Sequence, residues 1–242
     1  MAAGALALEG QPLAGTAPLE QQGDLATQMV AGIDRYLMRG LGEASARRLS
    51  AARKDPATLR EHLRRIIGAV DQRLPFGSPA PDATLRQSSL VASSPAYEIH
   101  AIRWPVFEGV DGEGLLLEPR QTPRGRVVAI PDAGWTPERL AGLAPGLLPE
   151  SQFARRLAEA GFLVVVPVLI DREDTFSGKE GVRFTNQPHR EFIYRMAYEM
   201  GRHIIGYEVQ KVLALVDWFA ASEPRRPAGV IGYGDGGLLA LY

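Results

Sequence analysis

The last residues of the 242-residue chain, Val230–Tyr242 (VIGYGDGGLLALY), constrain its fold more than any other segment. A short apolar run leads into a turn, residues 232–237, in which four of six residues are glycine. A second apolar run follows the turn. Glycine lets a backbone turn sharply and lets a helix approach a strand closely. The pattern therefore predicts a strand, a tight turn and a helix, a unit that is typical of α/β proteins.

The segments before this unit indicate the same fold class. Two continuous apolar runs, RVVAI at 126–130 and LVVVPVLI at 163–170, are typical of strands that are buried on both faces of a parallel sheet. Periodicity predicts the following order: strands at 97–106, 114–118 and 126–130, a helix at 153–160, a strand at 163–170, a long helix at 191–221 and a strand at 229–231. We therefore predict an α/β fold with a doubly wound, mostly parallel sheet.

The handedness of such a fold predicts where its loops meet. Because crossovers between parallel strands are right-handed, the loops 131–150 and 232–237 should lie at the same carboxyl edge of the sheet. Any site of the fold is then expected between these two loops.

The N-terminal third of the chain has a different composition. Residues 1–23 are rich in Ala, Gly, Gln and Pro without a period, and we expect them to be disordered. Residues 24–81 are predicted to be a helical extension with a linker, and 82–242 to be the main domain. The extension should hold one helix capped by Asp24 and interrupted near 40–42, a second at 57–73, and a Pro/Gly linker at 75–81. We expect it to pack on the main domain.

Composition excludes several classes of protein. The net charge of −1 lacks the excess of Lys and Arg that nucleic-acid binding requires. No apolar run is long enough for a membrane span, and the N-terminus lacks the basic segment of a signal peptide, so the compartment is left open. The chain has no cysteine, which excludes disulfides and a cysteine nucleophile. The acidic residues Asp171, Glu173 and Asp174 lack the spacing of a metal site, and we expect neither metal nor cofactor.

Two stretches before the glycine turn carry a resemblance to a known family. They are NQPHREFIYR at 186–195 and GRHIIGYE at 201–208. Together with the strand order, they make residues 95–242 resemble the N-terminal part of an α/β-hydrolase of the dienelactone hydrolase and acetyl xylan esterase type. In that family the strand–turn–helix unit is the nucleophile elbow, in which small residues flank a serine in a strained turn. Gly232 and Gly236 match the small flanks, so Gly234 takes the position of the nucleophile.

The resemblance implies hydrolysis of a carboxylic ester, either a small molecule or an acylated carbohydrate. It also implies an oxyanion hole made by the N–H of Asp235 and by an N–H from the loop at Asp132 and Ala133. Gly234, however, offers no nucleophile, so we expect this chain to be catalytically impaired as written.

The other two members of the triad are expected beyond Tyr242, because in this family the acid and the histidine follow the elbow. All four histidines precede it: His62, His100, His189 and His203. We therefore expect the chain to be part of a longer protein. Its sheet would need the C-terminal half of the fold, or an oligomer partner, to cover an open edge.

Three other interpretations remain open. The chain could be a non-catalytic binding or scaffold protein that keeps the hydrolase fold. Asp235 could attack in place of a serine, although Tyr233 would crowd that arrangement, and the carboxylate could equally cap the helix. Gly232, Gly234 and Gly237 also satisfy the dinucleotide pattern G-x-G-x-x-G, although that fingerprint normally follows the first strand of its domain.

Several polar and aromatic residues are candidates for the rim of a cleft. Trp135, His189 and Arg190 are placed there by the order of the elements, with helix capping and local salt bridges as the alternative roles of the last two. Asp132 either lines the cleft or starts a turn. Glu208 could be the buried partner of an arginine.

Overall fold

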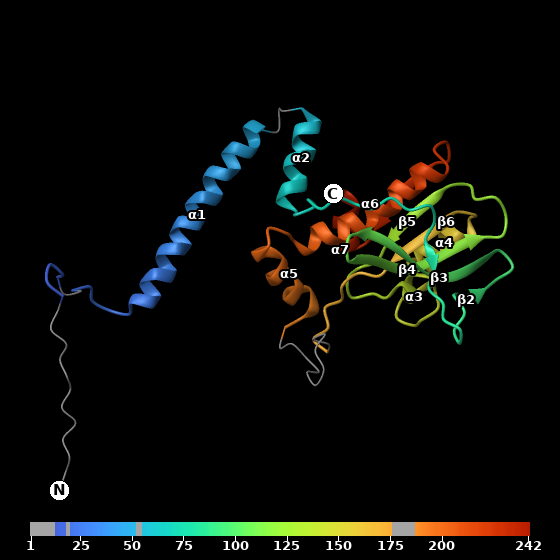
Figure 1. Ribbon diagram of the computed structural model, residues 1–242, viewed down its shortest axis with the longest axis horizontal. Coiled ribbons are helices and arrows are strands. Elements are labelled where there is room, and N and C mark those ends of the chain that lie inside the picture. The colour runs from blue at the N-terminus through green and yellow to red at the C-terminus, as the bar shows by residue number, and fades with distance from the viewer. Residues whose placement is uncertain (1–12, 18–19, 52–54, 176–186) are drawn as a thin grey trace, which may run out of the picture. The chain divides into compact units, whose positions relative to one another are not determined.

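The computed structural model describes residues 13–17, 20–51, 55–175 and 187–242. The chain divides into two compact units, Met1–Leu59 and Arg60–Tyr242 (Figure 1). Residues 60–81, which the sequence placed in the extension, belong to the second unit, where Ile67 and Ala69 are buried in the core. Most of the segment expected to be disordered lies outside the described residues.

The first unit holds helix α1 (Leu25–Ala51) and the start of helix α2 (Pro56–Ile66). Asp24 caps α1 as predicted, because its carboxylate accepts from the N–H groups of Ala26 (3.1 Å) and Thr27 (3.2 Å). The predicted interruption is wrong: α1 continues through both glycines, each of which costs a helix only about 1 kcal/mol. The predicted second helix is too long, since α2 ends at Ile66.

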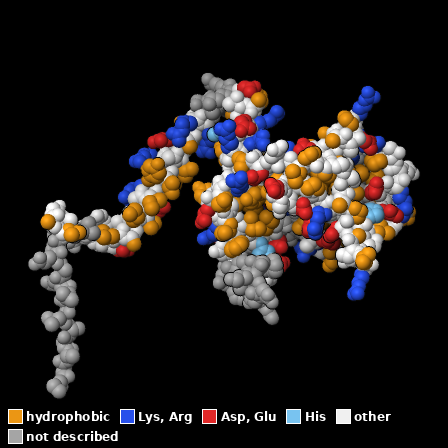
Figure 2. Space-filling model, in the orientation of Figure 1, with side chains coloured by type: hydrophobic (Ala, Val, Ile, Leu, Met, Phe, Trp, Pro, Cys, Tyr) orange, Lys and Arg blue, Asp and Glu red, His pale blue; other side chains and the backbone are white. Residues whose placement is uncertain are grey.

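An apolar stripe runs along α1 (Figure 2). Its side chains are exposed and include Met29, Val30, Ile33, Tyr36, Leu37 and Leu41. The expectation that the extension packs on the main domain remains a prediction.

The second unit is built around a seven-stranded sheet in the order β1-β3-β4-β6-β5-β7, with β2 paired to β3. Its strands are β1 (Ala80–Pro81), β2 (Leu90–Ser93), β3 (Tyr97–Phe107), β4 (Val110–Pro119), β5 (Arg126–Ile130), β6 (Leu163–Pro167) and β7 (Ala228–Gly232). The pairs β5–β6 and β5–β7 are parallel, and β4 joins β6 antiparallel. The predicted strand at 163–170 is shorter in the structure and ends at Pro167.

Helices cover both faces of this sheet, which confirms the predicted α/β fold. Side chains of β5 alternate between two cores: Val128 and Ile130 belong to the core under α6 (Ile204–Ser222) and α7 (Asp235–Leu241). Ala129 belongs to the opposite core, under α3 (Pro137–Leu140) and α4 (Phe153–Glu159). A short 3₁₀ helix, Pro149–Ser151, precedes α4.

The long helix predicted at 191–221 is in fact two helices, α5 (His189–Glu199) and α6. Gly201 (φ 68°) ends the first, and His203 caps the second by accepting from the Ile205 N–H at 3.1 Å. The break lies where residues 67–68 pack against the start of α6. A Cβ on Gly206 would approach the carbonyl oxygen of Ile67 to 2.2 Å, so only glycine allows this contact.

Gln210 on α6 is fully buried, and within the described residues neither atom of its amide has a hydrogen-bond partner. A buried amide without partners costs about 1–3 kcal/mol. We therefore expect Gln210→Leu to raise the free energy of unfolding by about 1 kcal/mol in a urea titration. A fall in the free energy of unfolding would contradict this expectation.

No helix in the described ranges combines the length and the apolar character that crossing a membrane requires.

Candidate functional site

The turn between β7 and α7 has the backbone shape of an elbow. Gly234 adopts φ 58° and ψ −124°, a conformation that costs other residues about 1–3 kcal/mol. The two nearest flanking glycines, Gly232 and Gly236, allow backbone segments to approach each other closely. A Cβ on Gly232 would lie 2.0 Å from the carbonyl oxygen of Gly236, and one on Gly236 would lie 2.3 Å from that of Ile130. Both flanking positions therefore require glycine.

The loop after β5 meets this turn at the carboxyl edge of the sheet, as the handedness of the fold predicts. The Tyr233 N–H donates to the Ile130 carbonyl (3.2 Å), and the Asp235 N–H donates to Oδ2 of Asp132 (3.2 Å). Residues 132 and 235 are thus brought together although they lie 103 positions apart in sequence.

Asp132 fills the space in front of Gly234. A Cβ built on Gly234 would lie 2.0 Å from Oδ2 of Asp132 and 2.9 Å from its Cγ. The other carboxylate oxygen, Oδ1, accepts from the Gly134 N–H (2.9 Å) and from Nη1 of Arg172 (2.8 Å). Asp132 therefore both starts a turn and faces the elbow, which joins the two roles that the sequence left open.

Hydrogen bonds keep Asp132 ionised. Burial by itself would raise the pKa of this carboxyl. The N–H groups of Gly134 and Asp235 and the guanidinium of Arg172 outweigh burial, and the pKa of Asp132 lies below its ordinary value of 3.8. A negative charge therefore stands at the elbow at neutral pH.

A chain of ion pairs, in which acidic and basic side chains alternate, leads from the elbow into the protein. Arg172 bridges Asp132 and Asp235, and Nε of Arg190 lies 3.9 Å from Oδ2 of Asp235. Arg190 in turn binds Glu208 through two bonds of 2.8 and 3.0 Å. We call these five side chains the elbow network; three of them are acidic and two are basic.

Glu208 anchors the network inside the protein. Its side chain is fully buried, and Oε1 also accepts from the Ile170 N–H at 3.0 Å. Glu208 is therefore the buried partner of an arginine, and Arg190 makes the salt bridge that the sequence offered as its alternative role.

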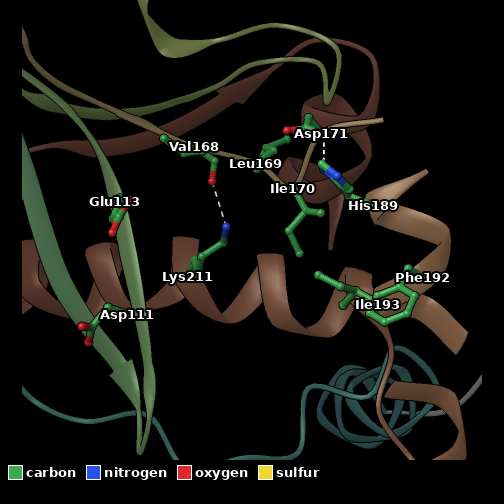
Figure 3. Close-up of a pocket in the computed structure, with 10 residues that line it drawn as sticks. All are labelled: Asp111, Glu113, Val168, Leu169, Ile170, Asp171, His189, Phe192, Ile193 and Lys211. Atoms are coloured by element: carbon green, nitrogen blue, oxygen red, sulfur yellow. Dashed lines mark hydrogen bonds and ion pairs between the residues drawn. The ribbon is translucent and has the colours of Figure 1, made fainter. Parts of the chain in front are cut away.

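The remaining candidates divide between two places. Trp135 stacks on Tyr233 beside the elbow, with ring centroids 4.8 Å apart and an interplanar angle of 6°. Ala133 is buried in the core. His189 has its Nδ1 2.7 Å from Asp171 and lines a cavity with Lys211 (Figure 3).

The similarity of this chain to known proteins is found in its three-dimensional structure and not in its sequence. No family model and no curated protein matches the sequence. Among solved structures, a protein of Bacteroides fragilis assigned as an acetyl xylan esterase aligns with a TM-score of 0.52 at 19% identity, over 74% of this chain and 47% of its own. The chain has the α/β-hydrolase fold.

Two further solved structures align less well. Acetyl xylan esterase 1 from Thermoanaerobacterium gives a TM-score of 0.43 at 11% identity, over 74% of this chain and 51% of its own. A dienelactone hydrolase from Anabaena variabilis gives 0.36 at 19% identity, over 60% and 56%. The chain spans about half the length of these α/β-hydrolase structures.

The Asp235 N–H already has an acceptor, because it donates to Oδ2 of Asp132. Any further acceptor at this N–H would have to compete with that carboxylate.

Sequence reasoning missed two members of the site. Arg172 lies between the acidic residues Asp171 and Glu173, which were considered only as possible metal ligands. Its position just after a buried strand, at the carboxyl edge of the sheet, was the available signal. Tyr233 was considered only as a crowding residue, whereas its ring forms a stacked pair with Trp135.

His203 should make stability depend on pH. Burial, and then the charge of Arg190, lower its pKa below the ordinary 6.5. As pH falls, His203 of the unfolded chain therefore takes up a proton at a higher pH than His203 of the folded chain. The stabilisation that neutral His203 gives is complete above pH 6.5 and is lost as pH falls through 6.5 towards the folded pKa. His203→Asn keeps a capping side chain without the titration. Between about pH 8 and 5, the Tm of the unsubstituted chain should fall relative to that of this variant; a constant difference would contradict the assignment.

Proposed function

We propose that this chain is a non-catalytic binding module of the α/β-hydrolase fold, related to carboxylic-ester hydrolases. One observation carries the proposal: Oδ2 of Asp132 occupies the space where a side chain on Gly234 would stand. The elbow thus lacks a nucleophile, and a neighbouring carboxylate fills the gap.

The charge at the elbow also opposes ester hydrolysis. A tetrahedral intermediate carries a negative oxygen, which needs unoccupied donors. Two unit charges of the same sign about 4 Å apart repel by about 4 kcal/mol near a protein surface. Asp132 would repel an oxyanion at the Asp235 N–H, although by less than this figure because Arg172 pairs with the same carboxylate at 2.8 Å.

The same charges count against the other two interpretations. As a nucleophile, Asp235 would have to leave the guanidinium groups of Arg172 and Arg190. A dinucleotide would bring its pyrophosphate to the start of α7, where the carboxylates of Asp132 and Asp235 lie. Phosphate binding at a helix start relies on free N–H groups, and the Asp235 N–H already donates to Asp132.

The stacked rings of Trp135 and Tyr233 support a binding role. Tyr233 is 59% exposed beside the elbow, so the pair offers an aromatic surface to a ligand. Because both guanidinium groups of the elbow network are already paired with its carboxylates, a neutral ligand suits this surface better than an anion. We propose a small ester or an acylated carbohydrate, the class named for the structural neighbour assigned as an acetyl xylan esterase.

Catalysis is tested with p-nitrophenyl acetate and a serine-reactive fluorophosphonate. The chain should give neither turnover nor a labelled peptide, because position 234 is glycine and residues 228–242 contain no serine or threonine. Saturable turnover of p-nitrophenyl acetate by the unsubstituted chain would overturn the proposal.

Binding is tested separately with acetylated xylo-oligosaccharides, followed by tryptophan fluorescence. Trp135 is next to the binding surface, whereas Trp104 is fully buried. The expected saturable change should disappear in Tyr233→Ala, with exposed Tyr198→Ala as the matched control. No change with the unsubstituted chain, or an equal change in both variants, would contradict this ligand class.

A further inference from the structure

A cavity of about 440 Å³ is lined by residues outside the elbow turn (Figure 3). Strand β4, the segment after β6, and helices α5 and α6 surround it, and no member of the elbow network is among its described lining residues. Its walls are mainly apolar, with Leu169, Ile170, Phe192 and Ile193 on one side of Lys211 (Figure 3). A cavity of this size, apolar with a few polar groups, is typical of a small-molecule site.

Lys211 is the one basic side chain among the described residues that line this cavity, apart from the imidazole of His189. Its Nζ donates to the carbonyl oxygen of Val168 at 2.8 Å. In the described part of the chain, no carboxylate lies within the 4.0 Å salt-bridge distance of Nζ, so a neutral carbonyl is its bonded partner.

The choice of lysine is itself informative. The chain contains only three lysines, at positions 54, 179 and 211, and the other 24 of its 27 basic side chains are arginine. Arginine stays charged at every accessible pH, whereas a lysine in a poorly solvated place can lose its proton and become a nucleophile.

The surroundings of Nζ favour that loss. Burial has the largest effect and lowers the pKa of Lys211; the carboxylate of Glu208 opposes it, followed by the smaller effects of Arg190, which lowers the pKa, and Glu113, which raises it. Asp171 and His189, bonded to each other at 2.7 Å, line the cavity on the side of Leu169 and Ile170 (Figure 3).

We propose that Lys211 forms a Schiff base with a neutral aldehyde or ketone that has an apolar body. The amine nitrogen attacks the carbonyl carbon and gives a carbinolamine. Loss of the carbonyl oxygen as water, with the two protons of the amine, then forms the C=N bond. No electrons are gained or lost overall, so no oxidant or reductant is needed.

The acidic residues of the lining favour a neutral ligand. Asp111 and Glu113 from β4 and Asp171 from the segment after β6 all line the cavity. Glu113 is paired with Arg103 at 2.7 Å, and Asp171 lies 2.7 Å from Nδ1 of His189, so neither pair offers a free cation to an anionic carbonyl compound such as a 2-oxo acid. Ile193 and Phe192 favour a neutral apolar or aromatic body.

The test traps the imine with cyanoborohydride at about pH 7, with benzaldehyde as the probe, and maps the alkylated lysines by peptide mass spectrometry. A lowered pKa leaves more of the amine unprotonated at pH 7. Lys211 should therefore react faster than Lys54, Lys179 or Lys211 of the urea-unfolded chain, and the rate should saturate with benzaldehyde. Glyoxylate should react with Lys211 more slowly than benzaldehyde.

Three variants link the reaction to the cavity. Lys211→Arg keeps the charge and a donor for Val168 but should abolish the trapped adduct at this position. Ile193→Trp should fill the cavity and slow labelling of Lys211 by about tenfold or more. Phe192→Ala, at a residue that is already 40% exposed, should raise the half-saturating benzaldehyde concentration without unfolding the chain. Labelling of Lys211 no faster than that of the other lysines, or unchanged in both cavity variants, would overturn the proposal.

Discussion

Glu208→Ala is expected to lower the free energy of unfolding by about 3–5 kcal/mol, because it leaves the charge of Arg190 without its buried partner. Glu208 is fully buried, and Arg190 is only 13% exposed. The substitution also removes the acceptor of the Ile170 N–H, 3.0 Å from Oε1. Urea titration monitored by circular dichroism measures the change.

The matched control lies on the same helix as Arg190. Glu191 and Arg195 form an exposed pair four residues apart, for which about 0.3–0.5 kcal/mol is the usual contribution. Glu191→Ala should therefore change stability by less than about 1 kcal/mol. Equal effects of Glu208→Ala and Glu191→Ala would show that the Arg190–Glu208 pair does not anchor the elbow network.

Gly234→Ser is expected to destabilise the chain by about 2–6 kcal/mol. Backbone strain at φ 58° contributes about 1–3 kcal/mol, and overlap of the new Cβ with Asp132 contributes about 1–3 more. Asp132→Ala alone should cost about 1–2 kcal/mol through its lost hydrogen bonds. The destabilisation of the double variant should be smaller than the sum of the two single effects by about 1–3 kcal/mol, because removing Asp132 makes room for the serine.

Gly229→Ser is the matched control for this cycle. Gly229 lies in β7 close to the elbow, its φ is not in the left-handed region, and a Cβ there would meet nothing within 4 Å. Its coupling with Asp132→Ala should be within about 0.5 kcal/mol of zero. Additive costs for Gly234→Ser and Asp132→Ala would mean that Asp132 does not occupy the elbow.

The sheet and its loops could be predicted because their signals are local. Continuous apolar runs at 126–130 and 163–170 are readable without knowledge of partners, and the glycines of 232–237 leave few other turns possible. The long helix could not be predicted correctly, because its break depends on residues 67–68, which pack against it from far along the chain. Tertiary packing overrode periodicity at that point.

The location of the site could be predicted more completely than the arrangement of its side chains. Handedness alone brings Asp132 to Asp235, yet no sequence pattern states that a carboxylate would turn towards Gly234. Arg190 and Glu208 lie 18 residues apart on two helices, so their pairing depends on the break between α5 and α6. Lys211 showed no motif, only the rarity of lysine in this chain.

The most direct measurement of the central claim is an NMR titration of the Asp235 and Gly134 amides. Both N–H groups donate to the Asp132 carboxylate, and the pKa of this group is depressed below 3.8. The stabilisation from Asp132 is therefore complete above 3.8 and is lost as pH falls through the folded pKa. The Gly134 signal should move with a midpoint below 3.8 and should not move in Asp132→Ala. Asp235 has a carboxyl of its own, so the part of its amide movement that Asp132→Ala removes is the part that reports on Asp132, and this part should share the Gly134 midpoint. An Asp235 signal whose titration is unchanged in the variant would show that Asp132 does not fill the elbow.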